Sequence, residues 1–361
     1  MRRGTTLGVL LLFINFIYTL HYTVGAYINS SFLEQFISVE FIGLVFAVAA
    51  LLAIVTLARI ERFLVRYGNF HLALFVLALD IAALIGLTVS GIYSESIPAL
   101  VPLFFFVAYY ATAVFILRFS LDVYYEEETT GQGVGKTRGK ILTASNFAWL
   151  ISPLIFGQLL GQEEFWKIYT VATLLAIVLL VLIIFHFRNI KDASFKRVYL
   201  KGTLKEVWRK KDIFRVFTAN FLLHFFFSWM VIYLPIHLHS TIGFSWEAIG
   251  FMLALTLLPY VIVDIPFGYI ADNFIGEKEL LQLGFLIIFT FTFPIALVSE
   301  ASFWLWTLIL FGARFGAATL EVMTDVYFFK KITERDANLI GFYRNSSPLS
   351  YILDRSLEVS C

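Results

Sequence analysis

The chain has 361 residues, of which 60% are hydrophobic and 15% are charged, and its formal net charge is +1. A soluble protein of this composition would expose more apolar surface than it can hide, so we expect lipid to surround most of the chain. The single cysteine, Cys361, excludes a disulfide framework and a metal site built on thiolates. We expect an integral membrane protein with no metal and no cofactor.

Apolar stretches of about 20 residues recur along the chain, each long enough to cross a hydrocarbon core of about 30 Å. Backbone groups in lipid must bond internally, so each stretch is predicted to be a helix. The expected fold class is an all-α polytopic membrane protein, with about ten clear spans and a partial eleventh. The predicted spans are 7–28, 36–58, 70–91, 97–121, 140–160, 165–187, 213–237, 246–270, 279–299 and 302–328. The weak eleventh segment begins at Ala337, but charged residues from Arg344 to Glu358 interrupt it.

Basic residues gather in alternate loops between these spans. One set of loops holds most of the lysines and arginines, whereas the other set holds only Lys167. Because cytoplasmic loops carry such an excess, the amino terminus is predicted to lie in the cytoplasm, with the protein in the plasma membrane. Since the basic clusters flank spans, we expect them to contact anionic lipid and not nucleic acid.

The longest polar segment separates two halves of the chain. We predict an N-terminal six-helix bundle over 1–187, a central cytoplasmic linker over 188–212 and an incomplete C-terminal bundle over 213–361. Short motifs recur at an offset near two hundred residues: Ser38–Gly43 matches Ser245–Gly250 at four of six positions, and Asp122–Tyr125 is echoed by Asp325–Phe328. Serine as a cap with glutamate in the first turn predicts a helix start in both copies of the first motif. Repeated halves of this kind indicate a transporter.

After the eighth span comes the sequence Gly268-Tyr-Ile-Ala-Asp272-Asn-Phe-Ile-Gly276-Glu-Lys278. This motif resembles the cytoplasmic signature of the major facilitator superfamily. The resemblance implies two six-helix bundles around a central cavity, and a cytoplasmic gate formed by Gly268, Asp272, Gly276 and Lys278. The first-half equivalent, Arg59–Gly68, is basic but has no matching aspartate. A repeat of the fifth and sixth spans would extend about 25–40 residues beyond Cys361, so we expect either a truncated chain or a ten-span derivative that lacks part of helix 11 and helix 12.

Polar residues inside the spans are the candidates for a transport site, since burying an ionisable group there costs about 3 kcal/mol or more. The resemblance implies that the first, fourth, seventh and tenth spans line the cavity. The polar and aromatic residues found there are Asn15, Tyr18, His21, Tyr22, Tyr109, Arg118, His224, Trp229, Tyr233 and Arg314. We interpret the two arginines as ligands of an anionic or polar substrate group, and the aromatics as stacking surface. For proton coupling the predicted residues are Glu321 and Asp264, with His21 and His224 as further titratable groups.

Structural alternatives stay open for several of these residues. Arg314 with Glu321, or Arg118 with Asp122, would then form an internal ion pair that only satisfies charge between helices. A lone histidine on an apolar helix is more often a hydrogen-bonded packing residue. Asp80, in a span that the family places at the periphery, is expected to bond a neighbouring backbone or hydroxyl group.

The sequence predicts a secondary active transporter of a small solute that works by alternating access, coupled to a proton or substrate gradient. Its partners would be a small-molecule substrate, protons where coupled, and the bilayer, with the chain as a monomer. The alternative is a non-transporting sensor or scaffold on a transporter fold. An enzyme is not predicted, because no metalloprotease motif, paired aspartate motif or activated serine is visible. The loop from Gly131 to Thr137 has lysine and threonine like a phosphate-binding loop, but Thr130 stands where that motif needs glycine.

Overall fold

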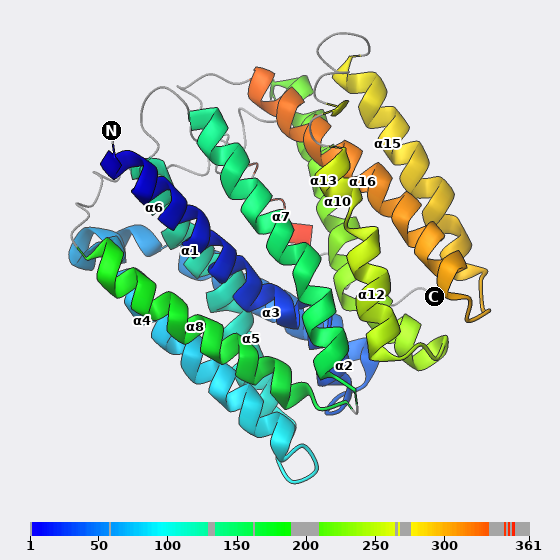
Figure 1. The fold of residues 1–361 in the computed structure, drawn as a ribbon, viewed down its shortest axis with the longest axis horizontal. Helices are drawn as coiled ribbons and strands as arrows, with labels where there is room; N and C mark the ends of the chain where they lie inside the picture. The colour runs from blue at the N-terminus through cyan, green and yellow to red at the C-terminus, as the bar shows by residue number, and fades with distance from the viewer. Residues whose placement is uncertain are drawn as a thin grey trace. The chain divides into compact units, whose positions relative to one another are not determined.

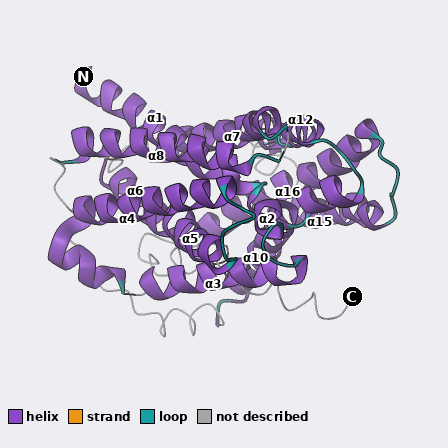
Figure 2. Cartoon of the chain, turned by 90° about the horizontal axis from the view of Figure 1, so that it is seen from below, coloured by secondary structure: helices purple, strands orange, loops and turns teal. Residues whose placement is uncertain are grey.

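A computed structural model of the protein describes residues 2–57, 59–128, 134–161, 163–188, 209–263, 266–267 and 276–331, together with 343, 346, 349 and 350. The chain divides into two compact units, Met1–Lys196 and Arg197–Cys361, each of which is described by itself. The described residues form helices, turns and loops, and no strand occurs among them (Figure 2). The predicted all-α fold class is therefore confirmed for the described part of the chain.

Unit 1 is a bundle of long helices joined by short turns. Helix α1 packs against α7 and α8, while α4 packs against α8 and α5, so α8 lies between α1 and α4 (Figure 1). The π-helix η1 joins α5 to α6 and touches both α3 and α4. The bounds are α1 Arg2–Ala26, α2 Asn29–Glu34, α3 Val39–Leu57, α4 Ile60–Ile92, α5 Leu100–Tyr110, η1 Ala111–Ile116, α6 Leu117–Glu128, α7 Val134–Leu159 and α8 Phe165–Phe187.

Unit 2 is organised around the long helix α16. This helix packs most extensively against α15 and also contacts α10, α12 and α13 (Figure 1). The bounds are α10 Lys211–Ile232, α11 Leu234–Ile236, η2 His237–Thr241, α12 Trp246–Thr256, α13 Pro259–Ile262, α15 Glu277–Thr292, η3 Phe293–Ala296 and α16 Phe303–Lys331.

Seven helical stretches among the described residues are long and apolar enough to cross a membrane, and two more are apolar but shorter. Every predicted span contains helix, but a count of ten crossings stays a prediction. The seven are Val39–Leu57, Phe63–Ile92, Leu100–Leu121, Phe165–Phe187, Lys211–Thr241, Glu277–Ala296 and Phe303–Phe328, and the shorter two are Leu10–Ala26 and Trp246–Ile262.

Several predicted spans are interrupted where the local sequence disfavours a continuous helix. Pro235 and Pro259 lie in the first turns of the short helices α11 and α13, because proline lacks the N–H that a continuing helix would use. Gly68 has a φ of 81°, which kinks α4 ahead of the predicted start of that span. The predicted span 97–121 is helical without a break from Leu100 onward, but the segment in its middle is the π-helix η1 and not an α-helix.

One predicted helix start is confirmed at atomic detail. The Ser245 hydroxyl accepts a 3.2 Å hydrogen bond from the backbone N–H of Ala248, and Glu247 lies in the first turn of α12. Such a cap satisfies one of the N–H groups that a helix leaves unpaired, and the acidic residue suits the positive end of the helix dipole.

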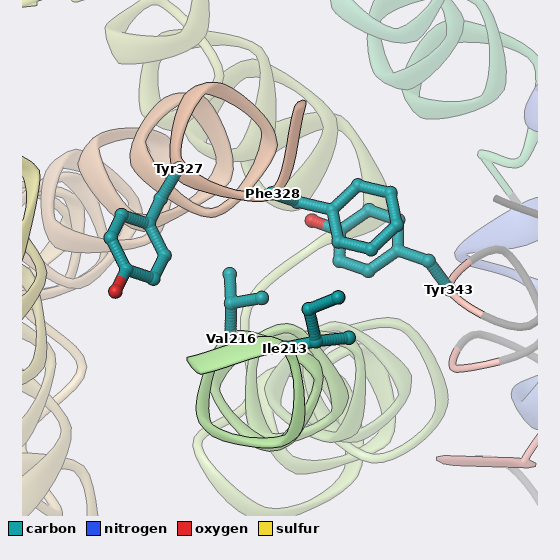
Figure 3. Close-up of a cluster of buried hydrophobic side chains, with 5 residues drawn as sticks. All are labelled: Ile213, Val216, Tyr327, Phe328 and Tyr343. Carbon is teal, nitrogen blue, oxygen red and sulfur yellow. The ribbon is translucent and has the colours of Figure 1, made fainter. Parts of the chain in front are cut away.

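Each unit contains a closely stacked pair of aromatic side chains. In unit 1, Tyr124 stacks on Phe187 with centroids 4.0 Å apart and planes 7° apart. In unit 2, Phe328 stacks on Tyr343 at 4.0 Å and 11° (Figure 3). Tyr343 belongs to the weak eleventh segment, and its hydroxyl donates a 2.9 Å hydrogen bond to Asp325. Part of that segment therefore packs onto unit 2.

The close approach of α15 and α16 depends on glycine. A Cβ added at Gly316 would lie 2.8 Å from the Gly284 carbonyl oxygen and 2.9 Å from the Ile288 nitrogen, both backbone atoms that cannot rotate away. We predict that Gly316→Ala destabilises the protein by about 1–3 kcal/mol, because overpacking forces the helices apart. Thermal unfolding in detergent would measure this loss.

Gly161→Ala is the matched control, since nothing lies within 4 Å of a Cβ added there. Equal melting temperatures for Gly316→Ala and the parent protein would show that the two helices separate without loss and would contradict the packing argument.

Candidate functional site

Several polar side chains of helix α1 in unit 1 are buried. Asn15, Thr19, His21 and Thr23 are each at most 1% exposed, although the helix lies in an apolar bundle. Buried polar groups need partners inside the protein, because lipid supplies none. The partners of these side chains therefore define which neighbouring helices the site includes.

Asn15 joins α1 to α7. Its Nδ2 donates to the Ser145 Oγ at 2.8 Å and to the Ile141 carbonyl oxygen at 3.0 Å. The Thr19 hydroxyl lies 3.2 Å from the same Ser145 oxygen. Both Asn15 and Ser145 are buried, so this contact acts as a clasp between the two helices.

An aromatic cluster lies one to two turns further along α1. The rings of Tyr18 and Tyr22 are 5.2 Å apart, and the Trp149 indole of α7 meets Tyr22 edge-on at 5.9 Å. The Tyr22 hydroxyl interacts with both Trp149 and the guanidinium of Arg118, which comes from α6. Arg118 itself is exposed at the surface of the unit. A cation therefore stands at an accessible position beside stacking aromatic surface, the pairing that an anionic group with an apolar body would bind.

A buried ionisable pair lies behind this cluster. His21 Nε2 is 2.8 Å from Asp80 Oδ2, and both side chains are completely buried. The separation is that of an ion pair, although the ring N–H is not aimed for a linear hydrogen bond. The Thr112 hydroxyl donates to the other carboxylate oxygen, Asp80 Oδ1, at 3.3 Å, which confirms the expected hydroxyl partner of Asp80.

The π-helix η1 connects the buried pair to the aromatic cluster. Thr112 lies in η1, and the Tyr18 hydroxyl donates a 2.8 Å hydrogen bond to the carbonyl oxygen of Ala113 in the same segment. Arg118 is the second residue after η1. Single π-turns inside helices occur frequently at functional sites, because they displace the regular bonding pattern.

Tyr109 completes the unit 1 site from α5. Its ring meets the His21 ring edge-on at 6.3 Å, and its hydroxyl donates to the Tyr22 carbonyl oxygen at 3.3 Å. The structure therefore brings together five residues predicted from different parts of the sequence, namely Tyr18, His21, Tyr22, Tyr109 and Arg118. Asn15 lies on the same helix, one turn before Tyr18 and Thr19.

The predicted residues of unit 2 lie on α10 and α16. His224 is partly buried and meets the Phe227 ring edge-on at 5.9 Å, while Trp229 and Tyr233 are partly buried further along the chain. Arg314 is 4% exposed in the middle of α16, and Glu321 is partly buried two turns later. Glu321 lies close enough to Tyr343 for its charge to act on that hydroxyl.

The predicted gate motif is described only in its second half. Asp264, Gly268 and Asp272 lie outside the described residues. Gly276 is the residue before α15, and Lys278 lies in the first turn of that helix. Lys278 Nζ is 4.0 Å from Asp212 of α10 and 5.7 Å from the centre of the Tyr327 ring, so the basic residue of the motif ties α15 to two neighbours.

Asp122, the suggested partner of Arg118, belongs to α6, but its side chain lies outside the described set.

Some residues of the unit 1 site were not predicted from the sequence. Asp80 could be singled out in the sequence as the only acidic residue of its predicted span. Its pairing with His21 could not be predicted. Trp149, Ser145 and Thr112 carried no signal, since aromatic and hydroxyl side chains are common along every span. Hydropathy indicates where along a membrane-spanning helix a residue lies, but it does not indicate which neighbouring helix the side chain contacts.

Comparison with known proteins places this helical membrane protein in a family. The family model described as Major Facilitator Superfamily matches residues 11–353. No curated protein matches the chain. The chain belongs to the major facilitator superfamily, and the resemblance seen in its signature motif is confirmed.

Two solved transporter structures share the fold. One is a bacterial homologue of the human lysosomal transporter Spinster, solved in an inward-facing and unoccupied conformation, with a TM-score of 0.69 and 11% identity over 98% of this chain and 81% of that one. The other is the nucleoside transporter NupG, with a TM-score of 0.72 and 11% identity over 97% of this chain and 89% of that one. The protein is thus a membrane transporter by family and fold, and a non-enzymatic one by the same relationship.

The clasp between Asn15 and Ser145 can be tested by a double-mutant cycle. We predict that Asn15→Ala destabilises unit 1 by about 1–3 kcal/mol, because Ser145 and the Ile141 carbonyl lose a buried partner. In the background of Ser145→Ala the same change should cost less, with a coupling of at least about 0.5 kcal/mol. Chemical or thermal unfolding of the four proteins gives this value, and strictly additive losses would show that the contact contributes nothing.

Proposed function

We propose that this protein is a secondary active transporter that carries a small solute across the plasma membrane by alternating access, driven by a proton or substrate gradient. Membership of the major facilitator superfamily and the likeness to two transporter structures support transport as such. The remaining details of the proposal rest on the residues of the site.

The observation that carries the substrate proposal is the cluster of Arg118, Tyr22 and Trp149. Arg118 is exposed on its unit, yet it interacts with the hydroxyl of a tyrosine that is 8% exposed. An arginine fork binds carboxylate or phosphate oxygens in two-pronged fashion, and the aromatic rings beside it offer an apolar face. The favoured substrate is therefore a small organic anion, or a polar solute with an acceptor group, that also has an apolar or planar part.

Unit 2 carries further residues that we propose for transport. Arg314 is proposed as a further cation, His224, Trp229 and Tyr233 as polar and aromatic lining, and Glu321 and Asp264 as proton-coupling residues. Their support is their position on the seventh, eighth and tenth predicted spans, where a charged side chain is costly unless it has a function or a partner.

Topology and gating belong to the same proposal. The amino terminus is proposed to lie in the cytoplasm, because Lys and Arg gather in the loops on that side. The segment 188–212 would then be a cytoplasmic linker between the two bundles, and the motif from Gly268 to Lys278 a gate on the same side. The ties of Lys278 to Asp212 and Tyr327 are the contacts that such a gate would loosen. The transporting form is proposed to be a monomer.

Flux through reconstituted vesicles tests the proposed function. We expect proton-gradient-driven uptake of at least one member of a panel of organic anions, sugars, nucleosides and amphipathic drugs. Arg118→Ala should reduce that uptake at least about tenfold, because a charged contact to the solute is worth about 2 kcal/mol or more. Arg118→Lys should retain part of it, since charge stays but the planar fork is lost.

Arg66→Ala is the matched control, because Arg66 is an exposed arginine of the same unit whose guanidinium lies over the Tyr67 ring. Absence of flux for the whole panel, with protein that is helical and monodisperse, would contradict transport and favour a sensor or scaffold. Uptake that survives Arg118→Ala unchanged would contradict the site while leaving transport in place.

A further inference from the structure

The pair His21 and Asp80 is set apart from other ionisable groups of unit 1 by its burial. Each side chain is 0% exposed, and Nε2 and Oδ2 are 2.8 Å apart. Among the described residues, His21 is the only basic side chain within ion-pair distance of Asp80. Asp80 lies near the middle of its span, about 18 Å along the helix axis from the kink at Gly68 and a similar distance from Ile92, at 1.5 Å per residue.

We propose that His21 and Asp80 form the proton-binding site of unit 1, and that the π-helix η1 transmits its protonation state to Arg118. This inference rests on the proposed transport function, for which it names the proton site and the coupled element. In the loaded state one proton is shared by the imidazole and the carboxylate, so the pair is neutral overall. On release that proton goes to water, and neutral histidine beside ionised aspartate leaves a net charge of −1 in the bundle.

Loss of the proton from the pair costs much free energy, because an uncompensated charge inside an apolar bundle is strongly disfavoured. The protein must therefore alter the contacts around Asp80 when the proton leaves. A pair that is fully buried in one arrangement and loses its proton only in another provides the link between proton movement and conformation.

The side chains around the pair and next to its neighbours come from six helices, and Thr112 comes from η1. Tyr109 of α5 faces the His21 ring, and Tyr169 of α8 lies 6.4 Å beyond Tyr109. Tyr18 and Tyr22 flank His21 on α1 itself, and Arg118 of α6 acts on Tyr22. From α7 the facing residues are Ser145 and Trp149, and from α3 the only ionisable residue is Glu40 in the first turn. Among these side chains, His21 is the one whose ordinary titration range is near neutral pH.

The path from the pair to Arg118 is short and bonded. The Thr112 hydroxyl lies 3.3 Å from Asp80 Oδ1, 2.8 Å from the Ala108 carbonyl oxygen and 3.1 Å from the Tyr109 carbonyl oxygen. It has one proton to donate, so Asp80 competes with the backbone of this segment for that proton. The same segment is held on its other side by Tyr18, through the Ala113 carbonyl. A π-turn contains one residue more than an α-turn, so a change of its bonding re-aims the side chains that follow. Arg118 is the second residue after η1.

His21 Nδ1 adds a second feature that a purely structural pair does not need. This ring nitrogen is buried and has no hydrogen-bond partner among the described residues. A packing histidine is normally fixed by bonds to both ring nitrogens.

The test follows protonation and conformation separately, without any substrate. His21 is followed by NMR of ¹⁵N-labelled imidazoles, with its signal assigned by its loss in His21→Gln. Conformation near Arg118 is followed by the mobility of a nitroxide on Phe119→Cys, made in a Cys361→Ser background so that it is the only thiol.

We expect the ¹⁵N signal of His21 and the ratio of mobile to immobile nitroxide to change together as the pH is varied, the nitroxide ratio by at least about fivefold. His21→Gln and Asp80→Asn should each abolish the nitroxide change. His71→Gln is the control, because His71 lies exposed on the helix that carries Asp80, and it should leave the change intact. Thr112→Val should keep the His21 titration and remove the nitroxide change.

Two results would overturn the proposal. One is a nitroxide change that occurs with no accompanying change in the His21 signal. The other is a nitroxide change that persists in Asp80→Asn and in the double variant His21→Gln/Asp80→Asn. Failure of transport itself would show as absent flux while the titration and nitroxide change persist, so the two proposals fail separately.

Discussion

Hydrocarbon offers no hydrogen-bond partners, and the arrangement of unit 1 depends on this constraint. A charge near the middle of a span costs about 3 kcal/mol or more when it is left alone, so Asp80 needs His21 and Thr112 in place. Asn15, Thr19 and Ser145 satisfy one another for the same reason. These contacts fix α1 against α4 and α7, and they leave the Tyr22 and Trp149 rings beside Arg118.

The two units share a scaffold but differ in chemistry. Asn220 donates to Ser346 at 2.7 Å in unit 2, about two hundred residues after the matching bond of Asn15 to Ser145 at 2.8 Å. The buried His21–Asp80 pair does not repeat, because the region about two hundred residues after His21 is the apolar run Phe225–Phe227 and Gly284 lies about two hundred residues after Asp80. A repeated scaffold with unlike ionisable groups is consistent with different roles for the two halves in the proposed transport.

The sequence predicted much of the helix arrangement along the chain. The expected range 165–187 coincides with α8, and the Ser245 cap is formed as predicted. Hydropathy failed at Pro235, Pro259 and the π-helix η1, where bonding of single backbone groups and not average polarity decides the path. It also failed to join His21 to Asp80, because residues far apart in sequence meet only through the packing of α1 against its neighbours. Aromatic residues make up 18% of the chain, so Trp149 could not be distinguished from lipid-facing rings.

The most direct test of this account compares two activities of Asp80→Asn in the same vesicles. For a solute carried by the parent protein, one measures exchange of labelled for unlabelled solute without a proton gradient, and accumulation driven by that gradient. We expect exchange to persist and proton-driven accumulation to be lost, because Asp80→Asn leaves the solute site in place but removes the proton site of unit 1. Accumulation at the level of the parent protein would contradict the assignment of proton binding to the buried pair in unit 1.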